Sequence, residues 1–190
     1  MKPMLMNTEM VKAILAGRKT QTRRLVKERH LRVLDSPYHK EHSEVPDKVL
    51  LEKLCESPYQ SDDVLYVRET WCKGSLNGGA EQYFYRADDN DFHCKWRPSI
   101  HMPKEAARIF LRVTNVRVER LKDIEDGWRF DEEGIILYHG MISEAWRDFA
   151  DLWNSTIKKS DLGKYGWDAN PWVWVIEFER ISKEEALKNA

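Results

Sequence analysis

The stretch ILAGRKTQTRR, from Ile14 to Arg24, crowds four cations around two threonines directly after a short apolar segment. Val11, Ile14 and Leu15 recur at helical spacing, so we expect a short helix that Thr8 caps and that stops at Gly17. Residues 18–26 then read as a strand, whose side chains alternate between two faces. The two faces carry Lys19, Gln21, Arg23 and Leu25 on one side, and Thr20, Thr22, Arg24 and Val26 on the other.

The charge of this segment has three interpretations. Between Arg18 and Arg32 there are seven Lys or Arg residues and one acid, in a chain whose net charge is −1. Such a run is typical of a solvated surface strand. It also suits a phosphate-binding edge, where a guanidinium group binds a phosphate through two hydrogen bonds and threonine hydroxyls add further contacts. A third interpretation is a lysine–threonine catalytic pair, and the residues alone leave all three open.

The remaining pattern predicts strands that are spread widely along the chain and one long amphipathic helix at 143–157. Because strands and helices do not alternate as βαβ units would, we expect an α+β fold, a mixed β-barrel with peripheral helices. Residues 28–60 read as an irregular polar insertion with one helical turn near 49–55. The further strands are expected at 64–70, 81–89, 110–121 and 172–181, and the tail after 182 is helix-prone.

Composition fits a folded protein of one domain, since 42% of the 190 residues are apolar and eight are Trp. The three cysteines form no CxxC motif, so we expect free thiols. No apolar run reaches the roughly 20 residues that span a bilayer, and the N-terminus lacks a signal-peptide core. These observations predict a cytoplasmic protein with no membrane partner.

Other residues have both functional and structural interpretations. Glu69 lies inside an apolar strand, where a carboxylate is either paired in a salt bridge or used. Trp71 and Trp96 fall near expected strand ends and are predicted to be exposed, whereas the aromatic run 83–85 favours the core. Interleaved cations and aromatics are typical of single-stranded nucleic-acid binding. The loop at 165–172 either plugs one end of the barrel or holds a flat ring.

Metal and cofactor sites are not expected. His93 and Cys94 are adjacent, so they point to opposite faces of a strand, and His39 and His42 have no further ligand at a suitable spacing. The sequence also contains no glycine-rich phosphate loop.

Four segments together resemble the ASCH domain family of the PUA-like superfamily, in its prophage-encoded form: ILAGRKTQTRR, SDDVLYVRETW, LRVTNVRVERLKDI with EEGI, and WVWVIEFERI. The resemblance implies a PUA-like barrel formed by residues 1–190 as a single domain. Its insertions would lie at about 28–60 and 71–104, and a polar tail would start at about 183. It also implies a basic cleft for RNA, a nucleotide or a modified nucleoside.

The resemblance assigns roles to particular residues. RNA or nucleotide contacts are implied for Arg18, Lys19, Thr20, Arg23, Arg24, Arg68, Glu69 and Trp71. Alternatively, the chain is an amidohydrolase of N4-acylated cytidine or a ribonuclease, with Lys19 as base, Thr22 as nucleophile and Glu133 as proton shuttle. Glu132 competes with Glu133 for the last role. A further alternative is a protein-interaction module in which the basic segment docks a protein partner.

The predicted Lys19–Thr22 pair requires an irregular backbone between the two residues. Residues three apart on a regular strand face opposite ways, so the two side chains share a site only if the chain turns or bulges after Gly17.

Overall fold

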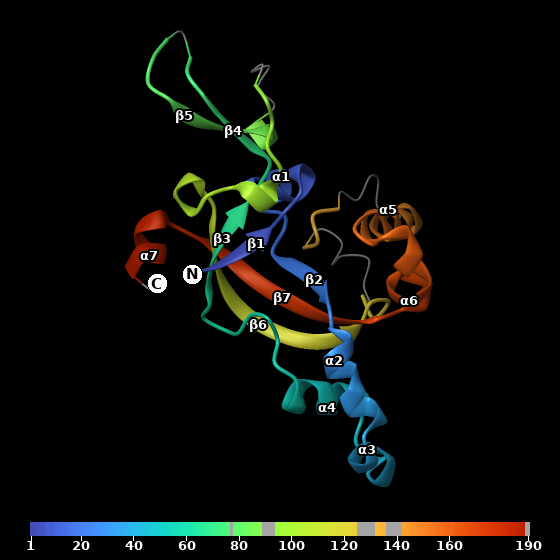
Figure 1. The fold of residues 1–190 in the computed structure, drawn as a ribbon. Helices are drawn as coiled ribbons and strands as arrows, with labels where there is room; N and C mark the ends of the chain where they lie inside the picture. The colour runs from blue at the N-terminus through green and yellow to red at the C-terminus, as the bar shows by residue number, and fades with distance from the viewer. Residues whose placement is uncertain (77, 89–93, 125–131, 136–141, 189–190) are drawn as a thin grey trace. The chain divides into compact units, whose positions relative to one another are not determined.

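Five strands form a mixed sheet in the order β1-β3-β6-β7-β2 in the computed structural model, and β4 and β5 form a second sheet (Figure 1). The structure describes residues 1–76, 78–88, 94–124, 132–135 and 142–188. The strands are β1 (Lys2–Leu5), β2 (Gln21–Leu25), β3 (Val64–Arg68), β4 (Trp71–Gly74), β5 (Gln82–Tyr85), β6 (Phe110–Arg120) and β7 (Trp172–Ile181). The expected α+β class is confirmed. A closed barrel stays a prediction, because the pairing order of the described strands has two ends, β1 and β2.

The helices correct one sequence-based expectation. Residues 28–60 were expected to be irregular apart from one turn, but they form four helical segments. One of them starts where the Ser36 side chain accepts a hydrogen bond from the His39 backbone N–H. The α-helices are α1 (Thr8–Leu15), α2 (Glu28–Leu31), α3 (Pro37–Glu41), α4 (Asp47–Leu54), α5 (Ile142–Ser155), α6 (Leu162–Tyr165) and α7 (Lys183–Lys188). The 3-10 turns are η1 (Arg32–Asp35), η2 (Arg86–Asp88), η3 (Ser99–His101), η4 (Lys104–Ala106), η6 (Lys159–Asp161) and η7 (Trp167–Ala169). Residues 125–131 of the acidic stretch 121–135 lie outside the described residues.

The contacts of the chain divide it into two compact units, and the expectation of a single domain stays a prediction. Unit 1 comprises Met1–Thr20, Ser61–Thr114 and Phe178–Ala190, and unit 2 comprises Gln21–Gln60 and Asn115–Glu177. In unit 1, β1 pairs in parallel with β3, and β3 pairs antiparallel with β6. A core cluster of unit 1 gathers residues from β3, β4, β6 and α7, including Val64, Trp71, Phe110 and Ala186.

Helix α1 of unit 1 shows how local sequence sets its ends. Its N-cap is Asn7, whose side chain accepts a hydrogen bond from the Met10 backbone N–H at 2.8 Å. The expected cap, Thr8, is instead the first residue of the helix. Gly17 follows the helix with a φ of +72°, the left-handed conformation that glycine adopts without strain. The expected stop at Gly17 is therefore confirmed.

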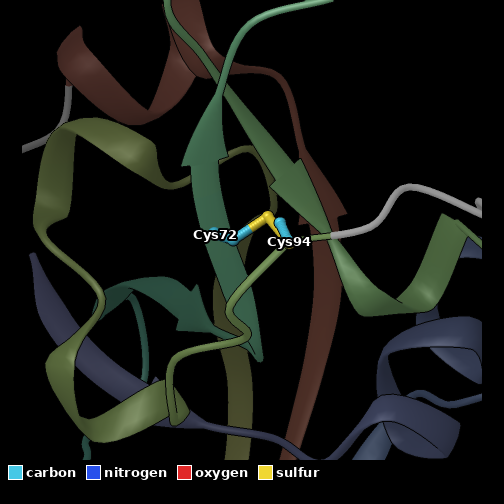
Figure 2. Close-up of a disulfide and its surroundings, with 2 residues drawn as sticks. All are labelled: Cys72 and Cys94. Carbon is cyan, nitrogen blue, oxygen red and sulfur yellow. A yellow bond between two sulfur atoms is a disulfide. The ribbon is translucent and has the colours of Figure 1, made fainter.

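A disulfide joins Cys72 of β4 to Cys94, with a Cα–Cα distance of 6.5 Å (Figure 2). The expectation of three free thiols is therefore wrong, and only Cys55 is free. Spacing could not reveal the pair, because the two cysteines are 22 positions apart in the sequence and the β4–β5 hairpin lies between them.

In unit 2, β2 pairs antiparallel with β7, from Gln21 opposite Glu177 to Leu25 opposite Val173. Figure 1 shows β2 in blue running beside β7 in red. One face of this pair packs on α5, where Phe149 and Trp153 join Val173 and Val175 in a core cluster. The predicted helix at 143–157 and the alternation of β2 are both confirmed, and this packing fixes which face of β2 turns inward.

Candidate functional site

One face of β2 carries polar side chains into the interior of unit 2. Gln21 and Arg23 are 0% and 3% exposed, and they share their face with Leu25. They meet side chains from β6, β7 and the segment at 132–135. We call this set the buried charge network: Gln21, Arg23, Arg117, Glu119, Glu133 and Glu177.

Arg23 is the centre of the network. Its Nη1 donates to Glu133 Oε1, and its Nη2 lies 3.4 Å from Glu119 Oε2. Its guanidinium also lies 5.9 Å from the ring centroid of Phe149 on α5, at cation–π distance. A buried guanidinium held by two carboxylates is neutralised within the protein, so Arg23 does not present a free cation to a phosphate.

Arg117 joins the other strands of the network. It donates to Glu119, to Glu177 and, at 3.3 Å, to the side-chain oxygen of Gln21. Burial lowers the pKa of Arg117, but the hydrogen bonds and charges of Glu119 and Glu177 outweigh it and raise the pKa overall. The network therefore holds two arginines against three glutamates.

Two donors in the network have no acceptor among the residues that the structure describes. The Gln21 Nε2 and Arg23 Nε atoms are buried, and neither hydrogen-bonds to a described residue. Buried polar groups in native proteins are nearly always paired, and a buried unpaired donor costs about 1–3 kcal/mol. Two such donors on adjacent positions of one strand face thus favour an acceptor that comes from outside the chain.

The opposite face of β2 carries Thr22, which is 1% exposed, and Arg24. Arg24 Nη1 donates to Thr22 Oγ1 at 3.0 Å and to the Arg23 carbonyl at 3.1 Å. Burial lowers the pKa of Arg24, while the charges of Tyr59 and Glu133 raise it in part. A guanidinium on the threonine oxygen favours a negative charge there.

Of the other predicted residues in the opening stretch, Lys19 is buried at 3% exposure, Arg18 is half-buried and Thr20 is exposed. The backbone N–H groups of Arg18 and Lys19 donate to the Ala13 carbonyl, which carries the chain out of α1. These three residues belong to unit 1, whereas Thr22 and Glu133 belong to unit 2. The convergence of Lys19, Thr22 and Glu133 stays a prediction.

Glu69 in unit 1 is fully buried and binds Arg108 in a bidentate pair, at 2.9 and 3.0 Å. Arg108 also pairs with Asp88 at 2.7 Å and lies over the Tyr85 ring at 3.9 Å. Burial raises the pKa of Glu69, although Arg108 lowers it in part. This geometry favours the salt-bridge interpretation of Glu69.

Arg68 and Trp71, the two remaining residues of unit 1 that were predicted to contact a ligand, also contact other parts of the chain. Arg68 donates to the Ile100 carbonyl. The expected exposure of Trp71 is wrong, because it is 4% exposed, packs in the core cluster of unit 1 and is covered by Arg97 at 5.2 Å. Trp96 is half-buried beside Arg86 at 5.4 Å.

Metal-ligating side chains do not gather in sets of three or more among the residues that the structure describes. His39 instead pairs with Asp47 at 2.9 Å in unit 2, and His93 lies outside the described residues. None of the described helices is long and apolar enough to cross a bilayer.

Sequence reasoning did not single out Glu119 and Glu177 as site residues. The alternation of side chains along each strand was the available signal. It places Arg117 and Glu119 on one face of β6, and it places Glu177 on the same face of β7 as Val175. What the alternation could not supply was the register that sets Glu177 opposite Gln21.

Comparison with known proteins adds little. No family model and no curated protein matches the sequence. One solved structure, protein EF3133 from Enterococcus faecalis V583, of family DUF984, aligns over 97% of this chain and 80% of its own, with 12% identity and a TM-score of 0.45. A similarity at this level supports no statement on fold or function, and the ASCH resemblance stays a prediction.

Proposed function

We propose that the protein binds a modified nucleoside through the buried charge network of unit 2. The observation that carries the proposal is the pair of buried, unpaired donors, Gln21 Nε2 and Arg23 Nε. A pyrimidine ring offers carbonyl and ring-nitrogen acceptors for such donors, while its exocyclic N–H can donate to a carboxylate such as Glu133. The predicted PUA-like barrel would present this face to its ligand.

The charge of the network favours a neutral ring over an RNA backbone. Arg23 and Arg117 already bind three carboxylates, and Arg24 brings the local sum only to zero. Phosphates would meet these carboxylates at close range, and like charges repel. We therefore place the nucleobase or nucleoside, rather than an extended phosphate chain, at this network.

Hydrolysis of an N4-acylated cytidine is the second candidate, and the hydrogen bond from Arg24 to Thr22 favours it. In this reaction the Thr22 oxygen attacks the acyl carbonyl while its proton passes to a base, a role that the ASCH resemblance implies for Lys19. The C–N bond breaks, the leaving nitrogen takes a proton, and water then releases the carboxylic acid from the threonine ester. Arg24 would stabilise the oxyanion of Thr22, and Glu133 would carry the proton.

Calorimetric titration with N4-acetylcytidine and cytidine tests binding. We expect saturable binding by the wild type and a three- to tenfold loss, about one hydrogen bond, in Gln21→Leu. Gln82→Leu, at an exposed position of β5 in unit 1, is the matched control with the same change of side chain and should bind normally. An absence of nucleoside binding, together with salt-steep binding of a single-stranded RNA, would replace the proposal with phosphate recognition.

Acetate release from N4-acetylcytidine tests the second candidate separately. Thr22→Val keeps the shape of the side chain and removes its hydroxyl, so we expect it to bind the nucleoside but release no acetate. Equal release by the variant and the wild type would exclude Thr22 as the nucleophile.

A further inference from the structure

A pocket of about 220 Å³ lies in unit 2, apart from the two unpaired donors of the buried charge network. Its apolar wall comes from the end of β2 and from β7, and its polar wall comes from α2 and the chain after α4. The lining residues are Leu25, Lys27, Arg29, His30, Glu56, Ser57, Pro58 and Trp174. Six of these eight residues belong to the predicted insertion or immediately precede it, so the insertion builds the pocket.

His30 contributes a donor without an acceptor. Arg29 Nε donates to His30 Nε2 at 3.0 Å, so Nε2 accepts and the proton of the neutral ring sits on Nδ1. That Nδ1 atom is buried and makes no hydrogen bond. Burial lowers the pKa of His30, helped by the charges of Arg29 and Lys27, which keeps the ring neutral and the Nδ1–H in place.

The other polar groups of the pocket are mainly donors as well. Ser57 Oγ accepts from the Tyr59 backbone N–H at 3.3 Å, which leaves the hydroxyl proton for another partner. Lys27 and Arg29 are exposed, and neither forms an ion pair with a residue that the structure describes. Glu56 is the one acidic residue in the lining.

We propose that this pocket binds the phosphate group of a small phosphate monoester. A dianion matches the two unpaired cations, Lys27 and Arg29, and its oxygens accept from the His30 Nδ1–H and the Ser57 hydroxyl. The volume is below the roughly 300–1,000 Å³ of pockets for drug-sized ligands, so it suits a phosphorylated sugar rather than a nucleic-acid strand. The apolar wall of Leu25 and Trp174 would face the carbon skeleton.

This site does not depend on the proposed nucleoside site, since the ligand needs no base. Calorimetric titration of the full chain with ribose 5-phosphate, inorganic phosphate and ribose tests it. We expect ribose 5-phosphate to bind with one-to-one stoichiometry, phosphate to bind more weakly and ribose not to bind. If inorganic phosphate binds more tightly than ribose 5-phosphate, the ligand is the free phosphate ion, bound by the same residues of the pocket.

Charge variants locate the binding. The double variant Lys27→Gln/Arg29→Gln should lose at least about tenfold in affinity, because it removes both charge-assisted hydrogen bonds. Glu56→Gln should gain about threefold, because it removes the opposing charge. Lys48→Gln/Lys53→Gln, on exposed positions of α4, is the matched control with the same change in net charge and should bind as the wild type does.

His30 gives a second readout. The ring of ¹⁵N-labelled His30 should show a shift of its Nδ1 signal on saturation with ribose 5-phosphate, and His30→Phe should weaken binding while Tyr38→Phe, on an exposed ring of α3, should not. The proposal is overturned if the wild type shows no saturable binding, or if both double charge variants lose affinity equally.

Discussion

Replacing Arg23 by methionine tests whether the buried charge network holds unit 2 together. Methionine keeps most of the length of the side chain but removes the charge, and it takes the Arg23 guanidinium away from Glu133, which is only 4% exposed. Glu119 keeps its ion pair with Arg117. The expected result is a strong loss of stability, because the change removes one partner of a buried ion pair.

The magnitude follows from the geometry. At the 3.4 Å separation of Arg23 Nη2 and Glu119 Oε2, Coulomb's law gives about 5 kcal/mol of attraction at an effective dielectric of about 20. Desolvation of the ions offsets much of this, but removal of one buried partner typically costs about 3–5 kcal/mol. We expect Arg23→Met to lower the free energy of unfolding by about that amount. Arg23→Met/Glu133→Gln should recover more than half of the loss, because the side chain at position 133 then carries no charge that needs a partner.

Urea denaturation followed by tryptophan fluorescence measures these free energies. Lys164→Met is the control, since it breaks the exposed pair with Glu28 and should leave the transition midpoint unchanged within error. A loss below about 1 kcal/mol in Arg23→Met, or a double variant as unstable as the single one, would refute a net stabilising role of the Arg23 ion pairs.

Three further predictions rest on single contacts. Asn7→Ala should destabilise the protein by about 1 kcal/mol in the same urea assay, whereas Thr8→Ala should cost less, because the Asn7 side chain caps α1. Because burial raises the pKa of Glu69 above its ordinary value of 4.5, the folded state holds that proton more tightly than the unfolded state. The stability that this proton contributes is present below pH 4.5 and is lost as the pH rises through the raised pKa. Glu69→Gln should therefore flatten this decline when the free energy of unfolding is measured over a series of pH values. A variant whose stability declines as steeply as that of the wild type would contradict this prediction. Thiol titration of the denatured, unreduced chain should detect one thiol, that of Cys55, and three thiols after reduction; three before reduction would contradict the disulfide.

Strands β2, β3, β5, β6 and β7 and helix α5 were predictable because their periodicity is strong and local, whereas β1 and β4 were not predicted. The alternation from Phe110 to Arg120 and the i, i+3, i+4 spacing around Trp146 and Phe149 each require only one element to be read. The expectation failed where neighbours in space decided the outcome. Trp71 was expected at an exposed strand end, but Arg97 pairs with its backbone and lies over its ring.

Charge was harder to predict than structure. Counting Arg and Lys from Arg18 to Arg32 indicates a basic surface, but the count omits the carboxylates that the fold delivers from elsewhere. Glu119 and Glu133 lie 96 and 110 residues from Arg23 in the sequence. No local pattern contains that information, because the pairing depends on the order of β6 and β7 beside β2.

The opening segment therefore contains cations in two physical situations. On β2, Arg23 turns inward and is neutralised, so its contribution to binding lies in its unpaired Nε–H and not in its charge. After β2 ends, Lys27 and Arg29 are exposed, and they line a pocket beside a histidine whose Nδ1–H has no acceptor among the described residues. A neutral ring and a phosphate need different partners. The ring needs directed hydrogen bonds, whereas the phosphate needs hydrogen bonds and positive charge. Substitutions at Gln21 should thus alter nucleoside binding without changing phosphate affinity, and substitutions at Lys27 and Arg29 should do the reverse.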